Sequence, residues 1–308
     1  MTTNAIQSSH IYSTYFAPRG RSRIYTLGMQ IAQLYLSPFD QIIGFIGEAG
    51  SGKSVLIKGM FPGIELTNDD DGVNVRPLPL LEQEYETGFF TPHTYHLDIR
   101  FETGFHQLSE LEDAVRLAVR RGKRIIIEHF DLIYPLLGVN ANLLIGVGEQ
   151  IVITRPNLFG PLPQELCDIV YPSLAYRLMA HSAEDLCEYA MTQEQMLACS
   201  HGDIRHGFVL EFNEHQPDID IPALEARVNE LIRADLPIDY YDESHILLGG
   251  VQHYCTGPRT HVRSTGRIIG FRLLDHFIYD HFHKTYMLVG CVGDDSEENI
   301  RKLEKIHG

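Results

Sequence analysis

The stretch that decides the fold of the first half reads QIIGFIGEAGSGKSVLIKGM and spans residues 41–60. Residues 41–47 form a short apolar run of the kind buried in parallel sheets, and residues 53–60 predict a helix. The pattern G-x-x-x-x-G-K-[ST] is matched at every fixed position between them, by Gly47, Glu48, Ala49, Gly50, Ser51, Gly52, Lys53 and Ser54. Glycines at a strand-to-helix turn let consecutive backbone N–H groups face a phosphate. The sequence therefore predicts a phosphate-binding loop, the P-loop, at residues 47–54.

Such a loop predicts ATP and Mg²⁺ as cofactors. Lys53 would reach the β- and γ-phosphates, and the hydroxyl of Ser54 would ligate Mg²⁺. A carboxylate must also face the metal, and a group must orient the attacking water; Asp98 and Glu128, both on predicted strands, are the candidates. Spacing alone leaves each as either a site residue or a residue at a surface edge. The acidic run at 68–71 is either a solvated turn or the base of a small-molecule kinase.

The neighbouring segments predict a parallel α/β sheet flanked by helices. A helix is expected at 23–38, where Pro38 ends it, and another at 109–122, with Ser109 as N-cap and Glu112 completing a capping box. Strands are expected at 94–101 and 124–130.

A segment rich in Pro and Gly at 154–166 predicts the domain boundary. Beyond it an α+β pattern is expected, with helices at 175–197 and 222–235 and strands at 207–212, 238–254, 266–274 and 287–293. The predicted organisation is an N-terminal segment 1–22, an α/β domain 23–155, an α+β domain 160–294 and a charged tail 295–308 that forms a solvated helix.

The composition sets limits on function. The chain has 308 residues, 41 Asp and Glu against 25 Lys and Arg, and a formal net charge of −16, which argues against nucleic-acid binding through bulk positive charge. The five cysteines include no Cys-x-x-Cys pair, no apolar run is long enough to cross a bilayer, and the first residues lack a secretory pattern. A reduced, cytoplasmic protein without membrane contact is expected. We expect Cys199 to be a small buried apolar residue and His201 to lie near the surface.

Residues 23–130 resemble the TsaE-type ATPases of tRNA threonylcarbamoyladenosine biosynthesis. The likeness rests on a Thr-Leu-Gly-x-x-Ile-Ala helix from Thr26 to Ala32, the loop 47–54, and two strands that carry His96, Asp98, Arg100 and Glu128. The resemblance implies that Lys53 and Ser54 bind ATP, that Asp98 serves Mg²⁺ and that Glu128 supports hydrolysis. Two departures stand out: the switch segment near 76–79 has no Thr, and His129 stands where that family usually has Trp.

Residues 176–293 resemble the second additional domain of alanyl-tRNA synthetase and its free-standing AlaX-type relatives. The best-matching segment is Thr260-His261-Val262-Arg263-Ser264-Thr265-Gly266-Arg267-Ile268. The segments 181–186, 207–212 and 224–241 follow the family's order. The resemblance implies a tRNA-editing fold with a zinc site.

The family's zinc ligands come from His-x-x-x-His and Cys-x-x-x-His. Here the first motif reads His181-x-x-x-Asp185, and Gly257 occupies the usual place of the cysteine, with Cys255 two residues earlier. Two outcomes stay open: a rearranged zinc site of His181, Asp185, Cys255 and His261, or loss of the metal, which would leave a binding or scaffold domain.

Three functions follow as hypotheses. The first is an ATP-hydrolysing P-loop protein whose nucleotide state controls the attached editing-like domain, with a tRNA or a tRNA-modification protein as partner. The alternatives are a trans-editing hydrolase of mischarged tRNA and a P-loop kinase of a small molecule. The basic cluster from Arg19 to Arg23 is either an arm that contacts phosphate or RNA or a solvated N-terminal segment.

Overall fold

The computed structural model describes residues 12–68, 78–83, 93–213, 215–257 and 259–307. The chain divides into two compact units. The first comprises Met1–Ala17 and Arg21–Pro172, and the second comprises Pro18–Gly20 and Ser173–Gly308. The division falls inside a long helix, beyond the Pro-rich segment 154–166 in which the sequence predicted it.

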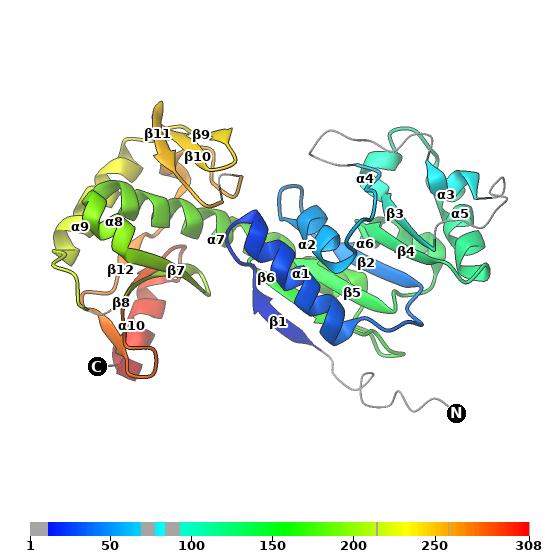
Figure 1. The fold of residues 1–308 in the computed structure, drawn as a ribbon, viewed down its shortest axis with the longest axis horizontal. Coiled ribbons are helices and arrows are strands. Elements are labelled where there is room, and N and C mark those ends of the chain that lie inside the picture. Colours follow the sequence, from blue (N-terminus) through cyan, green and yellow to red (C-terminus); the bar gives the residue numbers. More distant parts are fainter. Residues whose placement is uncertain (1–11, 69–77, 84–92, 214, 258, 308) are drawn as a thin grey trace. The chain divides into compact units, whose positions relative to one another are not determined.

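The first unit is built on a six-stranded, mostly parallel sheet with the order β1-β6-β5-β2-β4-β3 (Figure 1). Strands β5, β2, β4 and β3 run parallel, while β6 is antiparallel to β5 and the edge strand β1 is antiparallel to β6. The strands are β1 (Ser13–Phe16), β2 (Ile42–Ile46), β3 (Thr94–Asp98), β4 (Arg124–Glu128), β5 (Leu143–Val147) and β6 (Gln150–Thr154). The helices are α1 (Arg21–Tyr35), α2 (Lys53–Met60), α3 (Pro79–Glu82), α4 (Ile99–Glu102), α5 (Leu108–Arg120), α6 (Phe130–Leu137) and the start of α7 (Pro163–Ala190).

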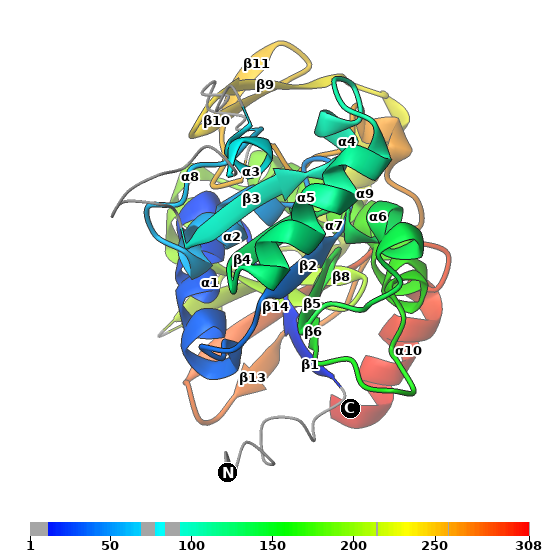
Figure 2. The same ribbon diagram turned by 90° about the vertical axis from the view of Figure 1, so that its right-hand side faces the viewer.

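Helices cover both faces of this sheet, which confirms the predicted layered α/β arrangement (Figure 2). Because side chains alternate along a strand, Ile43 and Phe45 of β2 pack with α1 and α2, whereas Ile42 and Ile46 belong to the core formed with α5 and α6. Helices α1 and α2 approach closely, since a Cβ on Gly28 would lie 2.5 Å from the carbonyl oxygen of Leu56. Helix α2 is thereby fixed against the sheet, directly behind the loop 47–54.

Several predicted boundaries in this unit are wrong. The predicted strand 94–101 ends at Asp98, because the Asp98 side chain accepts a hydrogen bond from the backbone N–H of Phe101 and starts α4. Helix α5 is capped by Gln107 rather than Ser109, with Glu110 completing the capping box. Strands β5 and β6 were not predicted at all.

The second unit contains two antiparallel sheets. One has the order β12-β14-β8-β7, with β13 also paired to β14, and the other has the order β11-β10-β9. Its strands are β7 (Cys199–Ile204), β8 (Gly207–Asn213), β9 (Ile238–Asp242), β10 (His245–Leu248), β11 (Val251–Tyr254), β12 (Arg272–Leu273), β13 (Ile278–Asp280) and β14 (Thr285–Cys291). Its helices are the rest of α7, α8 (Gln193–Ala198), α9 (Ile221–Arg233), the short 3₁₀ turn Thr265–Arg267 and α10 (Ser296–His307).

The core of this unit lies between α7, α9 and strands of both sheets, as the predicted α+β pattern requires. The predicted helix 175–197 is instead two helices, since α7 ends at Ala190 and α8 begins at Gln193. The predicted strand 266–274 is a 3₁₀ turn followed by the two-residue strand β12. The tail helix α10 is present, and its Ile300 is buried against Val209 and Val289 of the neighbouring strands rather than solvated. Among the described residues, no helix combines the length and apolar character needed to span a membrane.

Candidate functional site

The predicted site residues of the first unit converge at one edge of the sheet. Asp98 and Glu128 end the neighbouring parallel strands β3 and β4 and are paired in register. Glu128 is also in register with Phe45 of β2, and the loop 47–54 begins directly after that strand. Chain order reverses here, since β3 and β4 lie on one side of β2 and β5 lies on the other. In open α/β sheets, ligands bind outside the carboxyl ends of strands at such a reversal.

The loop requires its glycines. Gly50 and Gly52 have φ values of +79° and +94°, in the left-handed region that favours glycine. A Cβ on Gly47 would lie 2.5 Å from the carbonyl oxygen of Val147 in β5, so a larger residue would push the loop off the sheet. Helix α2 starts at Lys53, immediately after Gly52, which places the N-terminus of the helix at the loop.

Lys53 is buried under this loop. Its Nζ donates hydrogen bonds of 2.9 Å to the carbonyl oxygens of Gly47 and Glu48, and it lies 3.7 Å from Oε2 of Glu128. Burial lowers the pKa of the Lys53 ammonium, although the charges of Glu128 and Asp98 oppose that shift. The cation is therefore held between the loop and the carboxylates.

Three side chains contact the carboxylate of Glu128. Besides Lys53, Nε2 of His96 lies 3.1 Å from its Oε1, and the hydroxyl of Ser54 donates to the same oxygen at 3.4 Å. Burial alone would raise the pKa of the Glu128 carboxyl. The hydrogen bond from His96 and the charge of Lys53 outweigh that effect, so its pKa lies below the ordinary value and the group is ionised.

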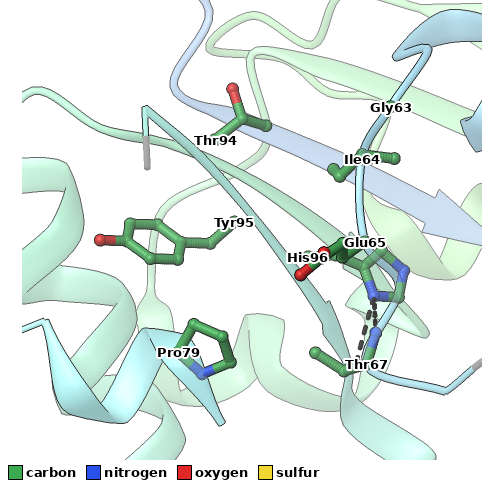
Figure 3. Close-up of a pocket in the computed structure, with 8 residues that line it drawn as sticks. All are labelled: Gly63, Ile64, Glu65, Thr67, Pro79, Thr94, Tyr95 and His96. Carbon is green, nitrogen blue, oxygen red and sulfur yellow. Dashed lines mark hydrogen bonds between the residues drawn. The ribbon is translucent and has the colours of Figure 1, made fainter. Parts of the chain in front are cut away.

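The tautomer of His96 follows from its other partner. The backbone N–H of Thr67 donates to Nδ1 of His96 at 3.1 Å, so Nδ1 carries no proton and Nε2–H donates to Glu128. A pocket of about 210 Å³ opens beside these residues, lined by Gly63, Ile64, Glu65, Thr67, Pro79, Thr94, Tyr95 and His96. Figure 3 shows Thr67 and His96 joined by hydrogen bonds at one end of this pocket.

Asp98 is fixed by two donors. Its Oδ1 accepts the hydrogen bond from Phe101 that caps α4, and its Oδ2 accepts from the side-chain amide of Asn68 at 3.2 Å. Asn68 belongs to the acidic run in the sequence. The aspartates of that run, Asp69 to Asp71, lie outside the described residues, as do Arg76 and Pro77 of the expected switch segment.

The sequence predicts no role for Glu48 beyond its place in the loop, and His129 stands out there only as a departure from the TsaE-type pattern. The guanidinium of Arg100 donates to Glu48 at 2.9 Å, which ties the loop to α4. His129 follows Glu128 with a φ of +56° and is the N-cap of α6. Burial and the nearby charges of Lys53 and Arg100 lower its pKa to about 4, so the imidazole is neutral at pH 7. The positive φ of a non-glycine residue beside the glutamate is a feature that spacing could not reveal.

In the second unit, three of the four predicted zinc ligands come together. Donor atoms of Asp185, Cys255 and His261 lie within 4.8 Å of one another, and His261 Nε2 is 2.5 Å from Asp185. His181 is engaged elsewhere. The Thr260 hydroxyl donates to the carbonyl of Gly257, so it accepts from Nδ1 of His181 at 2.9 Å.

These residues do not fit a zinc ion, because Arg19 already supplies the cation. The Arg19 side chain is 2% exposed and forms ion pairs with Glu184 and Asp185. It also lies 3.1 Å from Sγ of Cys255. Burial and the charge of Asp185 raise the pKa of the Cys255 thiol to about 12, and Arg19 opposes this shift.

Arg19 is the residue of this cluster that the sequence did not place. The sequence predicts that it belongs to a basic arm or to a solvated segment, yet it is buried within the second unit. A second donor group, Glu188, Cys199 and His201, was also missed. The signal for it was the spacing Cys199-x-His201, since alternate residues of a strand share a face.

No protein-family model matches the chain, and no curated protein is significantly similar to it. Its function is therefore argued from the geometry described above.

Proposed function

We propose that the first unit binds ATP with Mg²⁺ at the loop 47–54 and hydrolyses it. The observation that carries the proposal is the convergence of Lys53 and Glu128 where the loop leaves β2. A buried lysine at the start of a helix, beneath a glycine loop, suits the β- and γ-phosphates of a nucleotide. A glycine-rich turn that matched the pattern by chance would not require a buried lysine or carboxylates beside it.

The donor set also fits Mg²⁺, a hard cation that prefers oxygen ligands. Ser54 would hold the ion through its hydroxyl, with the Asp98 carboxylate as acidic partner. When bound, the ion neutralises charge on the phosphates. The Ser54–Glu128 contact of 3.4 Å brings Glu128 toward the same place, so in this proposal both carboxylates face the ion and the phosphates.

Glu128 would orient the attacking water. An ionised carboxylate is needed for this, and the hydrogen bond from His96 supports that state. Lys53 would exchange its hydrogen bonds to the carbonyls of Gly47 and Glu48 for contacts with the phosphates.

The second unit is proposed to be a binding domain whose state depends on the nucleotide, with a tRNA or a tRNA-modification protein as partner. The chain connectivity supports coupling, because Pro18–Gly20 belongs to the second unit while β1 and α1, which flank it, belong to the first. A zinc-dependent trans-editing hydrolase at Asp185, Cys255 and His261 is less well supported, because Arg19 occupies that cluster.

Calorimetric titration of the full chain with MgATP tests the proposal. Wild-type protein should bind one nucleotide, and Lys53→Ala should weaken binding at least about 100-fold, because a buried charge–phosphate contact is lost. Lys58→Ala, on the same helix α2, is the matched control and should bind as the wild type does. Equal affinity of Lys53→Ala and Lys58→Ala would contradict the assignment.

A further inference from the structure

A second group of metal-ligating side chains lies next to the Arg19 cluster in the second unit. Donor atoms of Glu188, Cys199 and His201 lie within 4.8 Å of one another. Sγ of Cys199 is 3.8 Å from Oε1 of Glu188, and Nε2 of His201 contacts the same oxygen. Tetrahedral zinc places its nitrogen, oxygen and sulfur ligands about 3.3–3.6 Å apart. The separation of Cys199 and Glu188 is close to this value, whereas His201 and Glu188 form a closer hydrogen-bonded pair that would have to open by about 1 Å to admit the ion.

Two elements supply the three donors. Glu188 is on α7, one turn after Glu184, and faces the core. Cys199 and His201 alternate along β7, so both side chains leave the same face of the strand. Rigid elements, rather than loop tips, therefore carry all three groups.

A further histidine, His253 of β11, lies beside Glu188 and Asp185. His253 is 8% exposed, and its Nε2 has no hydrogen-bond partner among the described residues. That atom lies 3.9 Å from Oε2 of Glu188, the oxygen opposite to the one that Cys199 and His201 approach. A buried imidazole behind a carboxylate can donate to the oxygen that a metal leaves free.

Three buried carboxylates lie close together in this part of the second unit. Glu184, Asp185 and Glu188 are each at most 6% exposed. Arg19 forms ion pairs with Glu184 and Asp185, whereas Glu188 contacts a thiol and the imidazoles of His201 and His253 and has a charged partner only when an imidazole is protonated. A buried carboxylate is costly unless it is paired with a charge or coordinates a metal.

We propose that Glu188, Cys199 and His201 bind a zinc ion. Mixed oxygen, sulfur and nitrogen donors suit Zn²⁺, and three protein ligands leave a fourth position for water or a substrate. Cys199 and His201 are partly exposed, so this position is reached from solvent. Cys199 loses its proton to solvent when the metal binds, and His201 binds as the neutral imidazole. The proposed zinc site belongs to the second unit, and its assignment does not rest on the proposed binding of ATP by the first unit.

Metal analysis of the full chain, loaded with Zn²⁺ and dialysed against a weak chelator, tests this proposal. The wild type should retain about one zinc per chain, and Cys199→Ser and His201→Gln should retain none. Replacement of zinc by Co²⁺ should give a thiolate-to-cobalt charge-transfer band, and that band should be absent in Cys199→Ser. His253→Phe should weaken zinc binding by about 10- to 100-fold.

The matched controls are Cys255→Ser, which alters the Arg19 cluster, and His283→Gln, an exposed histidine paired with Asp280. Both should keep the zinc and the cobalt band. Circular dichroism tests whether each variant is folded. If Cys199→Ser does not fold, Glu188→Gln removes another of the three proposed ligands and should likewise abolish zinc binding. A wild type that retains no zinc would overturn the proposal, and so would a band that is lost in Cys255→Ser but kept in Cys199→Ser.

Discussion

Nε2 of His96 donates to Oε1 of Glu128 across 3.1 Å, and the two residues lie on the neighbouring parallel strands β3 and β4. The backbone N–H of Thr67 fixes the tautomer of His96, so the direction of this bond is determined. The hydrogen bond from His96 thereby lowers the pKa of a buried carboxylate beside Lys53. The predictions for the first unit follow from this pair.

Replacing His96 should move the pH dependence of ATP hydrolysis. His96→Leu removes the hydrogen bond that lowers the pKa of Glu128, so that pKa should rise and the acidic limb of the kcat profile should shift to higher pH. His96→Gln retains a donor near the position of Nε2 and should restore much of the wild-type profile. If His96→Leu loses activity without any shift of the profile, His96 has only a structural role.

Glu128→Gln should separate binding from hydrolysis. The amide cannot serve as a base, so kcat should fall at least about 100-fold. The affinity for MgATP should change much less, because Lys53 and the loop remain. Glu65→Gln, at an exposed carboxylate nearby, is the control and should leave both values unchanged. A Glu128→Gln protein with wild-type turnover would remove Glu128 from the mechanism.

Arg19→Met should destabilise the second unit by about 3–5 kcal/mol, because it leaves Glu184 and Asp185 buried without their cation. Hydrogen exchange of peptides from α7 and β11 measures the loss locally. Arg259→Met, at an exposed arginine over the ring of Tyr240, should have little effect. Unchanged protection of α7 in Arg19→Met would contradict the role of Arg19 as the central cation.

Acid should destabilise the second unit through His181. Burial lowers the pKa of His181 to about 3, although Asp203 opposes this shift and Arg19 and Arg177 add to it. The unfolded chain takes up the proton first, near pH 6.5, so the contribution of His181 is complete above about pH 6.5. It is lost as the pH falls toward 3, at up to about 1.4 kcal/mol per pH unit.

His181→Asn retains a donor for Thr260 but does not titrate in this range. Chemical unfolding of this variant at several pH values should therefore show a weaker dependence between pH 4 and 6.5 than the wild type. Parallel curves for the two proteins would show that His181 is not the group responsible.

Local signals in the sequence predicted the centre of the first unit. The glycine pattern and the apolar run before it located β2, the loop and α2, and acidic residues at strand ends indicated Asp98 and Glu128. Helix α5 was found, but its cap was misplaced by two residues, because Ser109 and Glu112 satisfy the same pattern as Gln107 and Glu110.

What the sequence did not reveal depends on contacts between distant residues. Arg19 meets Asp185 across 166 positions of the chain, and no local pattern encodes that pair. His181 matched a ligand motif, yet the bond to Thr260 holds it away from Asp185 and Cys255. Glu188 of α7 meets Cys199 and His201 of β7 across 11 and 13 positions of the chain, so the group depends on how the chain folds back after α8.

The most direct test of the account is the Mg²⁺-dependent release of phosphate from ATP by the purified full chain. We expect steady turnover in the wild type and in Lys58→Ala. Turnover should be lost in Lys53→Ala and in Glu128→Gln, because Lys53 contacts the phosphates and Glu128 orients water in the proposed reaction. Phosphate release at the wild-type rate from Lys53→Ala, or none from the wild type, would contradict the account.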